Sequence, residues 1–210
     1  MVGFFVTFEG GEGTGKSTQV RLLADRLLQQ GRIVVVTREP GGTPQGEALR
    51  DLLLNAASHD WTSTSEALLN YAARAEHLRH VIVPALRRGE IVICDRFMDS
   101  TRAYQGYAGN CDLALIDALE KSIVGKQKPD LTIVLDIDPV VGLARAKSRG
   151  SVAEDRFERK PIDYHHRLRH AFLMIAEREP ERCRCINADH PVDEIAADVW
   201  SHVMAKRDGR

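Results

Sequence analysis

The chain has 210 residues, 43% of them apolar and 28% charged, and its formal net charge is −1. This length fits one domain, residues 1–210, with a substantial core. The near-neutral charge provides no global field for nucleic acid or an anionic membrane, so an anionic ligand would have to be held by local groups.

No apolar run approaches the roughly 18 residues that span a bilayer. The first residues lack the basic flank and the cleavage site of a signal peptide. The four cysteines form no disulfide pattern. We therefore expect a cytoplasmic protein with reduced thiols and no membrane partner.

Five short apolar runs predict strands that are buried on both faces. They are Phe4–Glu9, Ile33–Thr37, Ile91–Asp95, Leu131–Asp136 and Cys183–Asn187. Segments with helical spacing separate them, at about 20–30, 65–88, 112–124, 139–148, 162–177 and 193–204, and Pro84 is expected to kink or divide the second. Continuous apolar strands that alternate with helices predict a parallel sheet covered by helices on both faces.

A glycine-rich segment, GGEGTGKS, follows the first predicted strand and fits the phosphate-binding pattern G-x-x-x-x-G-K-[ST]. Glycines let backbone N–H groups converge on phosphate oxygens, and the helix N-terminus adds partial positive charge. We expect Lys16 to reach the β- and γ-phosphates and Ser17 to hold Mg²⁺. The alternative is a glycine-rich turn that binds nothing, which the flanking strand and helix disfavour. The residues predicted to bind the nucleoside triphosphate are Gly10, Gly11, Glu12, Gly13, Thr14, Gly15, Lys16, Ser17 and Thr18.

A bound nucleoside triphosphate leaves two classes of protein open. A switch or motor NTPase hydrolyses the nucleotide and signals through a conformational change, whereas a small-molecule kinase needs a second substrate site. The sequence has no N-K-x-D motif to read guanine and lacks the length of most motor ATPases. Evidence for a second site therefore distinguishes the two classes.

The third predicted strand ends in Asp95, and Arg96 follows it directly. A carboxylate at this place would hold Mg²⁺ by way of water, and the arginine would point the other way, toward a second phosphate. Phosphoryl transfer between two nucleotides needs both groups, because the protein mostly positions phosphates and neutralises their charge. The alternative is a surface Asp–Arg pair beyond a strand end.

The segment ICDRFMDSTRAYQ, Ile93–Gln105, resembles the thymidylate kinase signature D-R-aromatic-x-x-S-x-x-A-Y-Q. Thr37–Leu54, Tyr71–Arg74 and Lys128–Gly150 resemble further blocks of that family, in the family's order. The resemblance implies an α/β fold, a P-loop NTPase-type three-layer sandwich with a five-stranded parallel sheet of order 2-3-1-4-5. It also implies Mg²⁺-dependent transfer of the γ-phosphoryl group from ATP to dTMP, giving dTDP for dTTP biosynthesis, and a homodimer.

The resemblance assigns the acceptor site by position. It implies that Glu12 accepts a hydrogen bond from the deoxyribose 3′-hydroxyl, that Arg74 donates to thymine O4, and that Tyr104 excludes a 2′-hydroxyl. Arginines suit the acceptor phosphate because their planar fork can bind two oxygens at once. The residues expected to bind dTMP are Glu12, Arg38, Arg50, Tyr71, Arg74, Arg96, Ser100, Thr101, Tyr104 and Gln105.

One position departs from the family pattern. Many members have phenylalanine four residues before the helix arginine, stacking on thymine, and this sequence has Asn70 there with Tyr71 next to it. Two alternatives stay open: Tyr71 takes over the stacking, or Tyr71 belongs to the core. This departure from the family pattern bears on the affinity for the thymine base and does not bear on the type of reaction.

Arginines that act on the transferring phosphate are expected in a lid at about 142–160. The variable P-loop positions Gly11–Thr14 contain no arginine, and the sequence resembles the bacterial subgroup whose lid supplies the arginines. The predicted catalytic residues are Lys16, Arg96, Arg149 and Arg156. An alternative interpretation of the lid is a solvated charged loop. The rival functions are another nucleoside monophosphate or deoxynucleoside kinase and a regulatory P-loop ATPase.

Overall fold

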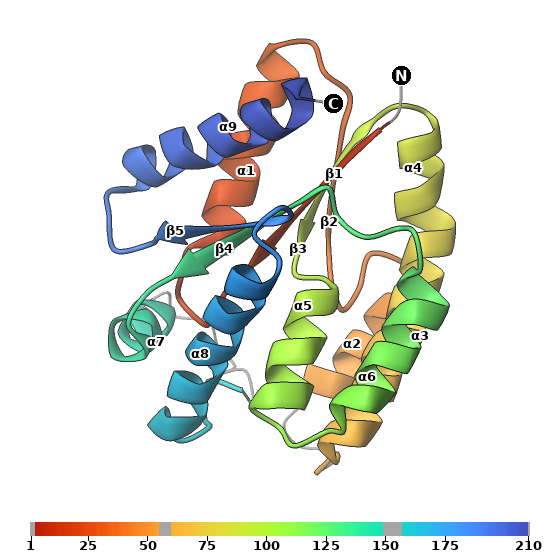
Figure 1. Ribbon diagram of the computed structural model, residues 1–210, viewed down its shortest axis with the longest axis vertical. Helices are drawn as coiled ribbons and strands as arrows, with labels where there is room; N and C mark the ends of the chain where they lie inside the picture. The colour runs from red at the N-terminus through yellow and green to blue at the C-terminus, as the bar shows by residue number, and fades with distance from the viewer. Residues whose placement is uncertain (1–2, 55–59, 149–156, 210) are drawn as a thin grey trace.

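The computed structural model describes residues 3–54, 60–148 and 157–209. Within these ranges, five parallel strands form one sheet in the order β2-β3-β1-β4-β5, which confirms the predicted sheet (Figure 1). The strands are β1 (Phe4–Glu9), β2 (Val34–Arg38), β3 (Ile91–Asp95), β4 (Leu131–Asp136) and β5 (Cys183–Asn187). Each strand has the predicted bounds except β2, which begins and ends one residue later.

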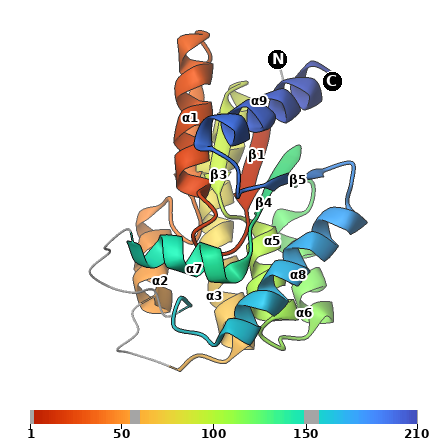
Figure 2. The same cartoon turned by 90° about the vertical axis from the view of Figure 1, so that its left-hand side faces the viewer.

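Helices cover both faces of the sheet, as Figure 2 shows from the side. α1 (Lys16–Gln29) and α9 (Val192–Asp208) pack together on one face. The other face carries α3 (Ser63–His77), η1 (Leu78–Ile82), α4 (Val83–Arg87), α5 (Met98–Thr101), η2 (Arg102–Tyr107), α6 (Leu113–Leu119), η3 (Glu120–Val124) and α8 (Ile162–Arg178). α2 (Pro44–Leu54) packs against α3, and α7 (Pro139–Ser148) packs against α8. None of the helices in the described ranges is long and apolar enough to cross a membrane.

The apolar core lies on both sides of β1, all of whose residues are buried. Alternate side chains of a strand point to opposite faces of the sheet. Phe4, Val6 and Phe8 pack into the core with α1 and α9, whereas Phe5 packs with Val92 of β3 in the core on the other face. A strand that is buried on both faces needs a continuous apolar run, because neither face is open to water.

The two edge strands differ from the prediction that every strand is buried on both faces. Val36 of β2 keeps 51% of its surface exposed, and Cys185 of β5 is exposed as well. β2 and β5 stand at opposite edges of the sheet. An apolar run therefore indicates a strand correctly but does not distinguish a central strand from an edge strand.

The predicted long helix is continuous, but its winding changes just before Pro84. α3 ends at His77, η1 has the wider π-helical winding, and α4 begins one residue before the proline. Proline has no N–H to donate, and its ring would collide with the carbonyl four residues earlier. The wider turn relieves this conflict, so the helix is divided into α3, η1 and α4 at the place where Pro84 was expected to kink or divide it.

Two helical segments were not predicted. They are α2, which follows the segment TREPGG (Thr37–Gly42), and the continuous pair α5 and η2. The buried side of α5 and η2 includes Asp99, Thr101 and Gln105. Polar residues on the buried side of a helix hide the apolar periodicity by which helices are recognised in a sequence.

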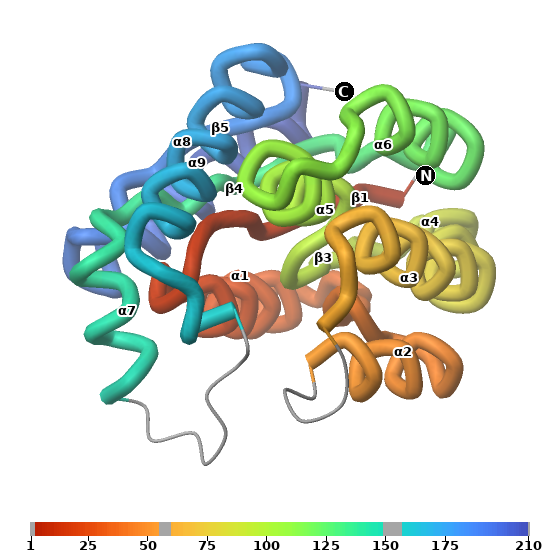
Figure 3. The backbone as a smooth tube through the Cα atoms, turned by 90° about the horizontal axis from the view of Figure 1, so that it is seen from below, coloured from red at the N-terminus to blue at the C-terminus, as the bar shows by residue number. Residues whose placement is uncertain are grey.

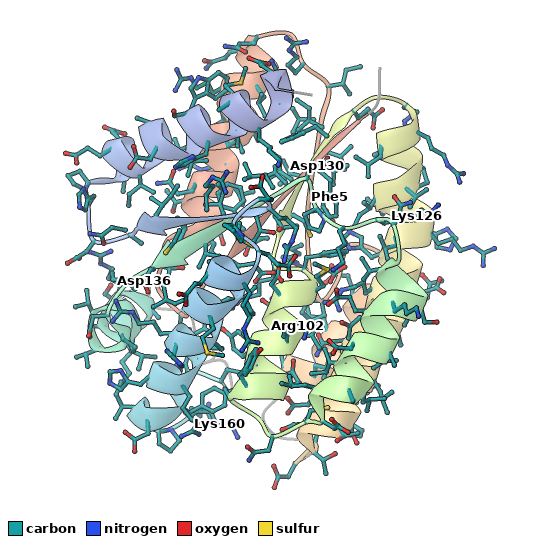
Figure 4. The ribbon with its side chains drawn as sticks, in the orientation of Figure 1. Phe5, Arg102, Lys126, Asp130, Asp136 and Lys160 are labelled. Atoms are coloured by element: carbon teal, nitrogen blue, oxygen red, sulfur yellow. The ribbon has the colours of Figure 1, made fainter. Side chains whose placement is uncertain are left out.

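Hydrogen bonds at the start of the central strands join β1 to the segment before β4. The Phe5 amide donates to the Asp130 carboxylate at 2.8 Å, and the Asp130 amide donates to the Phe5 carbonyl at 2.8 Å (Figure 4). At the other end of the sheet, Asp95 pairs with Phe8 and with Arg38. The strands therefore end at one edge of the sheet, which is where open α/β sheets bind ligands. In Figure 3, α1 lies on one side of the strands, and α5 and α8 lie on the other.

Candidate active site

The segment GGEGTGKS turns from β1 into α1, and both Gly10 and Gly13 have positive φ angles. At Gly13 an added Cβ would lie 1.8 Å from the carbonyl oxygen of Gly142 in α7, so this position excludes a side chain. Lys16 folds back over the loop, and its Nζ donates to the Gly11 carbonyl at 2.6 Å and to the Gly10 carbonyl at 3.1 Å. The loop thus has the close-packed, glycine-dependent form that phosphate-binding loops require.

Arg96 follows β3 in a left-handed conformation, with φ 70°, which is uncommon for a residue with a side chain. Its Nη1 donates to the Gly10 carbonyl at 3.0 Å and to Ser100 Oγ at 3.2 Å, and its Nη2 donates to the Glu12 carboxylate at 3.2 Å. The guanidinium lies 4.9 Å from the centre of the Tyr104 ring. Burial disfavours its charged form, but Tyr104 and Glu12 outweigh burial and raise the Arg96 pKa.

Arg96 lowers the pKa of both Glu12 and Lys16, which favours the charged form of Glu12 and disfavours the charged form of Lys16. Burial alone would raise the Glu12 pKa, but the charges of Arg96 and Lys16 outweigh it, and the pKa is lowered. The Glu12 carboxylate also accepts a hydrogen bond from the Tyr104 hydroxyl. Burial and then the like charge of Arg96 lower the Lys16 pKa to about 8. Glu12 is therefore held as an anion between two cations.

Ser17 and Asp95, the predicted metal ligands, lie together. Ser17 is in the first turn of α1 and Asp95 is the last residue of β3, and the Ser17 hydroxyl donates to Asp95 Oδ2 at 2.7 Å. Hydroxyl and carboxylate oxygens are ligands that Mg²⁺ accepts, and Mg²⁺ keeps several waters besides one or two protein ligands. The chemistry and the proximity of this pair fit a magnesium site.

A cavity of about 280 Å³ lies beside these residues. The predicted site residues that line it are Glu12, Gly13, Thr14, Gly15, Lys16, Ser17, Arg38, Arg50, Arg74, Asp95, Arg96, Ser100, Thr101, Tyr104 and Gln105. Gly10 and Gly11 border a smaller neighbouring cavity, and Thr18 and Tyr71 line neither. Residues that are distant in the sequence meet here because parallel strands end at a common edge.

Arg74 is a buried cation of the cavity wall, with 1% of its surface exposed. Its Nε donates to Glu39 Oε2 at 2.8 Å, and its Nη2 donates to the Phe97 carbonyl and the Thr101 hydroxyl, both at 3.0 Å. Its Nη1 has no hydrogen-bond partner among the described residues. Burial disfavours the charged form, but the charge of Glu39 outweighs it and the Arg74 pKa is raised. A buried donor without a partner is costly, so Nη1 is a candidate for contact with a ligand.

The structure places Tyr71 in the core, which corrects its assignment to the dTMP site. Its ring is fully buried beside Ala67 and Phe97, 4.5 Å from the Arg74 guanidinium. Asn70 lines the cavity instead. Adjacent residues of a helix point about 100° apart, so a helix that aims Asn70 at the cavity turns Tyr71 away from it. Tyr71 thus supports Arg74 by a cation–π contact and does not stack on a base.

Comparison with known proteins identifies the family. The protein-family model described as thymidylate kinase matches residues 8–199. The chain belongs to the thymidylate kinase family. A thymidylate kinase of Caulobacter vibrioides is 53% identical over 207 residues, which cover 99% of this chain and 98% of that protein. A thymidylate kinase of Rhodopseudomonas palustris is 53% identical over 206 residues, which cover 97% of this chain and 90% of that protein.

A solved structure of the thymidylate kinase family supports the fold. The crystal structure of thymidylate kinase from Ehrlichia chaffeensis superposes with a TM-score of 0.78 at 36% identity, covering 97% of this chain and 99% of that chain. Together with the sheet order, this confirms the predicted P-loop NTPase fold.

Two further arginines expected in the thymidylate kinase acceptor site lie on the TREPGG side of the cavity. Arg38, the last residue of β2, donates from Nη2 to Glu47 at 3.0 Å, and 55% of its side chain is exposed. Arg50 of α2 donates from Nη1 to the Pro40 carbonyl at 2.8 Å. Both line the cavity, so together with Arg96 they bring positive charge to it from three separate segments.

The predicted thymidylate kinase lid is described only in part. Arg149 and Arg156 lie outside the described residues. Arg145 of α7 donates from Nη1 to the Ala188 carbonyl at 2.8 Å and from Nη2 to Asp189 at 2.7 Å. Arg145 is therefore held by the loop after β5, whereas the catalytic roles of Arg149 and Arg156 stay predictions.

Three buried acids in or next to the cavity wall were not predicted. Glu39 accepts a hydrogen bond from Arg74, and Glu66 accepts one from Gln105 Nε2 at 2.8 Å. Glu9, the last residue of β1, is fully buried as well. Glu39 lies inside Thr37–Leu54, one of the blocks that resemble the family, and Glu9 ends a predicted strand, so both positions could be singled out in the sequence. Their burial was not visible in the sequence, because it depends on partners from other segments.

Proposed function

We propose that this member of the thymidylate kinase family transfers the γ-phosphoryl group of ATP to dTMP in the cytoplasm, giving dTDP for dTTP biosynthesis. The observation that carries the proposal is the buried guanidinium of Arg74 on the cavity wall, whose Nη1 is unused by any described residue. The thymine O4 carbonyl is the acceptor that this donor lacks. Thr101 and Gln105 line the same cavity and complete the contacts with the base.

The charges around the cavity suit two phosphate-bearing substrates. The P-loop amides and Lys16 hold the β- and γ-phosphates of ATP, while Arg96, Arg38 and Arg50 hold the phosphate of dTMP. Arg96 Nη2 donates to Glu12 Oε1 at 3.2 Å, and in the proposed complex a phosphate oxygen would replace part of this contact. Lys16 and Arg96 neutralise charge during the transfer, and no covalent intermediate is needed, because the acceptor phosphate is already anionic.

Mg²⁺ is the cofactor in this proposal, with Ser17 and Asp95 as the residues that would hold it. Bound there, the ion would supply positive charge that offsets the negative charge of the phosphates during transfer. Ser17 is exposed and Asp95 half-buried, and both line the cavity. Each can therefore exchange its present hydrogen bond for the ion or one of its waters.

Glu12 and Tyr104 form the sugar side of the proposed site. Glu12 is held as an anion by Arg96, and this acceptor suits the 3′-hydroxyl of deoxyribose. Tyr104 lines the cavity, and in the proposed binding mode a 2′-hydroxyl would meet its ring. Ribonucleotides are therefore excluded by steric conflict, which selects for the deoxyribose form.

Two parts of the proposal rest on the sequence and the family. Arg149 and Arg156 bring positive charge to the transferring phosphate when the lid closes, and closure excludes water. The protein forms a homodimer through its long helices, and Leu68 of α3, which is 47% exposed, supplies apolar surface for it. Light scattering of the purified protein tests the dimer, since a monomeric mass would reject it.

Release of ADP by the purified protein with ATP and Mg²⁺ tests the function, with dTMP, dUMP, UMP, CMP, AMP and GMP added in turn. We expect a strong response to dTMP, a weaker one to dUMP and background with the ribonucleotides. Arg74→Met is expected to raise the KM for dTMP about tenfold or more. Arg21→Met, at an exposed arginine of α1, is the matched control. ADP release without any acceptor would indicate a regulatory ATPase, and preference for another acceptor would indicate another nucleotide kinase.

A further inference from the structure

A chain of hydrogen bonds connects Arg74 of the cavity wall to residues that do not line the cavity. Arg74 Nε donates to Glu39 Oε2 at 2.8 Å, Glu39 Oε1 lies 2.9 Å from His77 Nδ1, and His77 Nε2 lies 2.7 Å from Thr37 Oγ1. Glu39 is 4% exposed and His77 is fully buried. The chain joins β2, which carries Thr37, through the TREPGG segment to α3, which carries His77 and Arg74.

We propose that His77 is a positioning residue for base recognition. With Thr37 it fixes the Glu39 carboxylate, and Glu39 in turn fixes the guanidinium of Arg74 on the cavity wall. The inference rests on the proposed contact of Arg74 with thymine and deepens it. It adds two residues, Thr37 and His77, that do not line the cavity and would act only through the residues they hold.

In this chain from Thr37 through His77 and Glu39 to Arg74, here called the relay, each hydrogen bond joins a donor to an acceptor. An ionised Glu39 carboxylate can only accept, so His77 Nδ1 carries a hydrogen and donates to Glu39 Oε1. In the neutral imidazole, Nε2 then accepts from the Thr37 hydroxyl; in the charged form, Nε2 donates to it. The hydroxyl can rotate to suit either case, so Thr37 and His77 hold Glu39 in the same place with or without the second proton.

Gly42 of the TREPGG segment makes room for the relay. A Cβ at this position would lie 2.6 Å from His77 Nε2 and 2.7 Å from Thr37 Oγ1, the two atoms that form the bond. Gly42 also has a φ of 79°, which side chains disfavour. The second glycine of the segment is therefore required by the contact between His77 and Thr37 as well as by the turn.

The orientation of the Arg74 guanidinium depends on Glu39, because the other hydrogen bonds of this side chain are all made by Nη2. Nη2 binds the Phe97 carbonyl and the Thr101 hydroxyl, and Nε binds Glu39, so these two nitrogens together fix the plane of the guanidinium. Without His77, Glu39 Oε1 would be buried without its partner, which favours rotation of the carboxylate away from its present position. This rotation loosens the bond to Nε and lets the guanidinium turn.

Steady-state kinetics of three variants test the relay. His77→Phe removes both ring nitrogens, His77→Gln keeps one donor and one acceptor, and Thr37→Val removes the hydroxyl. For His77→Phe we expect the KM for dTMP to rise about tenfold, while kcat and the KM for ATP change less than about twofold. His77→Gln is expected to recover most of this loss, and Thr37→Val to raise the KM for dTMP about threefold. His80→Phe, at a histidine whose side chain is 52% exposed, is the matched control and should change none of these constants.

A double variant separates positioning from a general loss of structure. If His77 acts through Arg74, adding His77→Phe to Arg74→Met changes the KM for dTMP no further. The proposal would be overturned if the two substitutions raised the KM for dTMP by factors that multiply in the double variant. It would also be overturned if His77→Phe lowered kcat and the affinity for both substrates to the same extent. Where thermal unfolding shows that His77→Phe does not fold, Thr37→Val decides, and an unchanged KM for dTMP there overturns the relay.

Arg74→Met also distinguishes failure of the relay from failure of the proposed function. An unchanged KM for dTMP in Arg74→Met rejects the base contact of Arg74, and the relay with it. A raised KM in Arg74→Met with an unchanged KM in a folded His77→Phe variant rejects the relay alone.

Discussion

The carboxylate of Glu9 accepts a hydrogen bond from the hydroxyl of Ser100 at 2.6 Å. The same carboxylate accepts the amide of Phe97 at 2.8 Å. The last residue of β1 thereby caps α5, whose N-cap position, Phe97, makes no side-chain cap of its own. Ser100 also accepts from Arg96 at 3.2 Å, so one buried acid joins the strand before the P-loop to the turn that carries the proposed phosphate-binding arginine.

Glu9→Gln is expected to remove a pH dependence of stability. Burial, followed by the charge of Asp99, raises the Glu9 pKa from 4.5 to about 8. The folded protein thus binds this proton more tightly than the unfolded chain does. The contribution to the free energy of unfolding is full below the unfolded pKa and is lost as the pH rises to about 8.

Urea unfolding at about pH 5.5, 7 and 8.5 measures this effect. Wild-type stability should fall along the series relative to Glu9→Gln, whose amide does not titrate. Parallel pH curves for the two proteins would show that Glu9 does not hold a proton in the folded state.

Arg182→Ala is expected to destabilise the protein by about 3–5 kcal/mol. Arg182 donates to the two carboxylate oxygens of Asp99 at 2.6 and 2.9 Å, and both side chains are nearly inaccessible to solvent. Loss of the arginine leaves the Asp99 charge buried beside Glu9. In contrast, Arg182→Met with Asp99→Leu removes both charges and should recover most of the loss. Equal free energies of unfolding for the single and double variants would contradict this account.

Arg96→Ala is expected to lose phosphoryl transfer while still binding ATP. The proposed contact of Arg96 is with the acceptor phosphate and the charge that develops on transfer, so kcat should fall by roughly 100-fold or more. ATP affinity, measured by calorimetry, should change less than about threefold, because Lys16 and the P-loop amides hold the nucleotide. Unchanged transfer would remove Arg96 from the site.

Tyr104→Ala is expected to relax the selection of deoxyribose. Edge-on contacts hold the ring in place, with its centroid 5.3 Å from that of Phe157 and 6.2 Å from that of Phe172. The ring therefore cannot easily move aside for a 2′-hydroxyl. The ratio of kcat/KM for dTMP to that for its ribose analogue should fall about tenfold. Tyr104→Phe keeps the ring, loses the hydrogen bond to Glu12, and should keep the ratio. The steric role is wrong if Tyr104→Ala leaves the ratio unchanged.

The phosphate-binding loop could be predicted because its residues are neighbours in the sequence. The two proposed metal ligands, Ser17 and Asp95, could be predicted because Asp95 ends a strand and Ser17 lies just after the loop that follows another strand. Gly13 adopts a positive φ and Lys16 begins a helix, and a few neighbouring residues are enough to predict both features. Ser17 and Asp95 are 78 residues apart, yet they meet because parallel strands end at one edge. The family resemblance extended this to most of the cavity wall.

Asn70 and Tyr71 show where the prediction stopped. The two residues are neighbours on α3, and nothing in their chemistry says which one faces the cavity. The packing of α3 against the sheet sets the rotation of the helix about its axis, and this rotation places Tyr71 in the core. The winding change before Pro84 belongs to the same class, because it depends on how the continuous helix accommodates the missing N–H.

The strands, the nucleotide-binding loop and the family followed from the amino-acid sequence, because periodicity and motifs express interactions over short distances in the chain. Only the tertiary structure showed which polar groups are buried and what they hold. His77 binds a carboxylate 38 residues away and Glu9 binds a hydroxyl 91 residues away. A buried polar group is stable only with such a partner, and the packing of the sheet and its helices determines which partner it has.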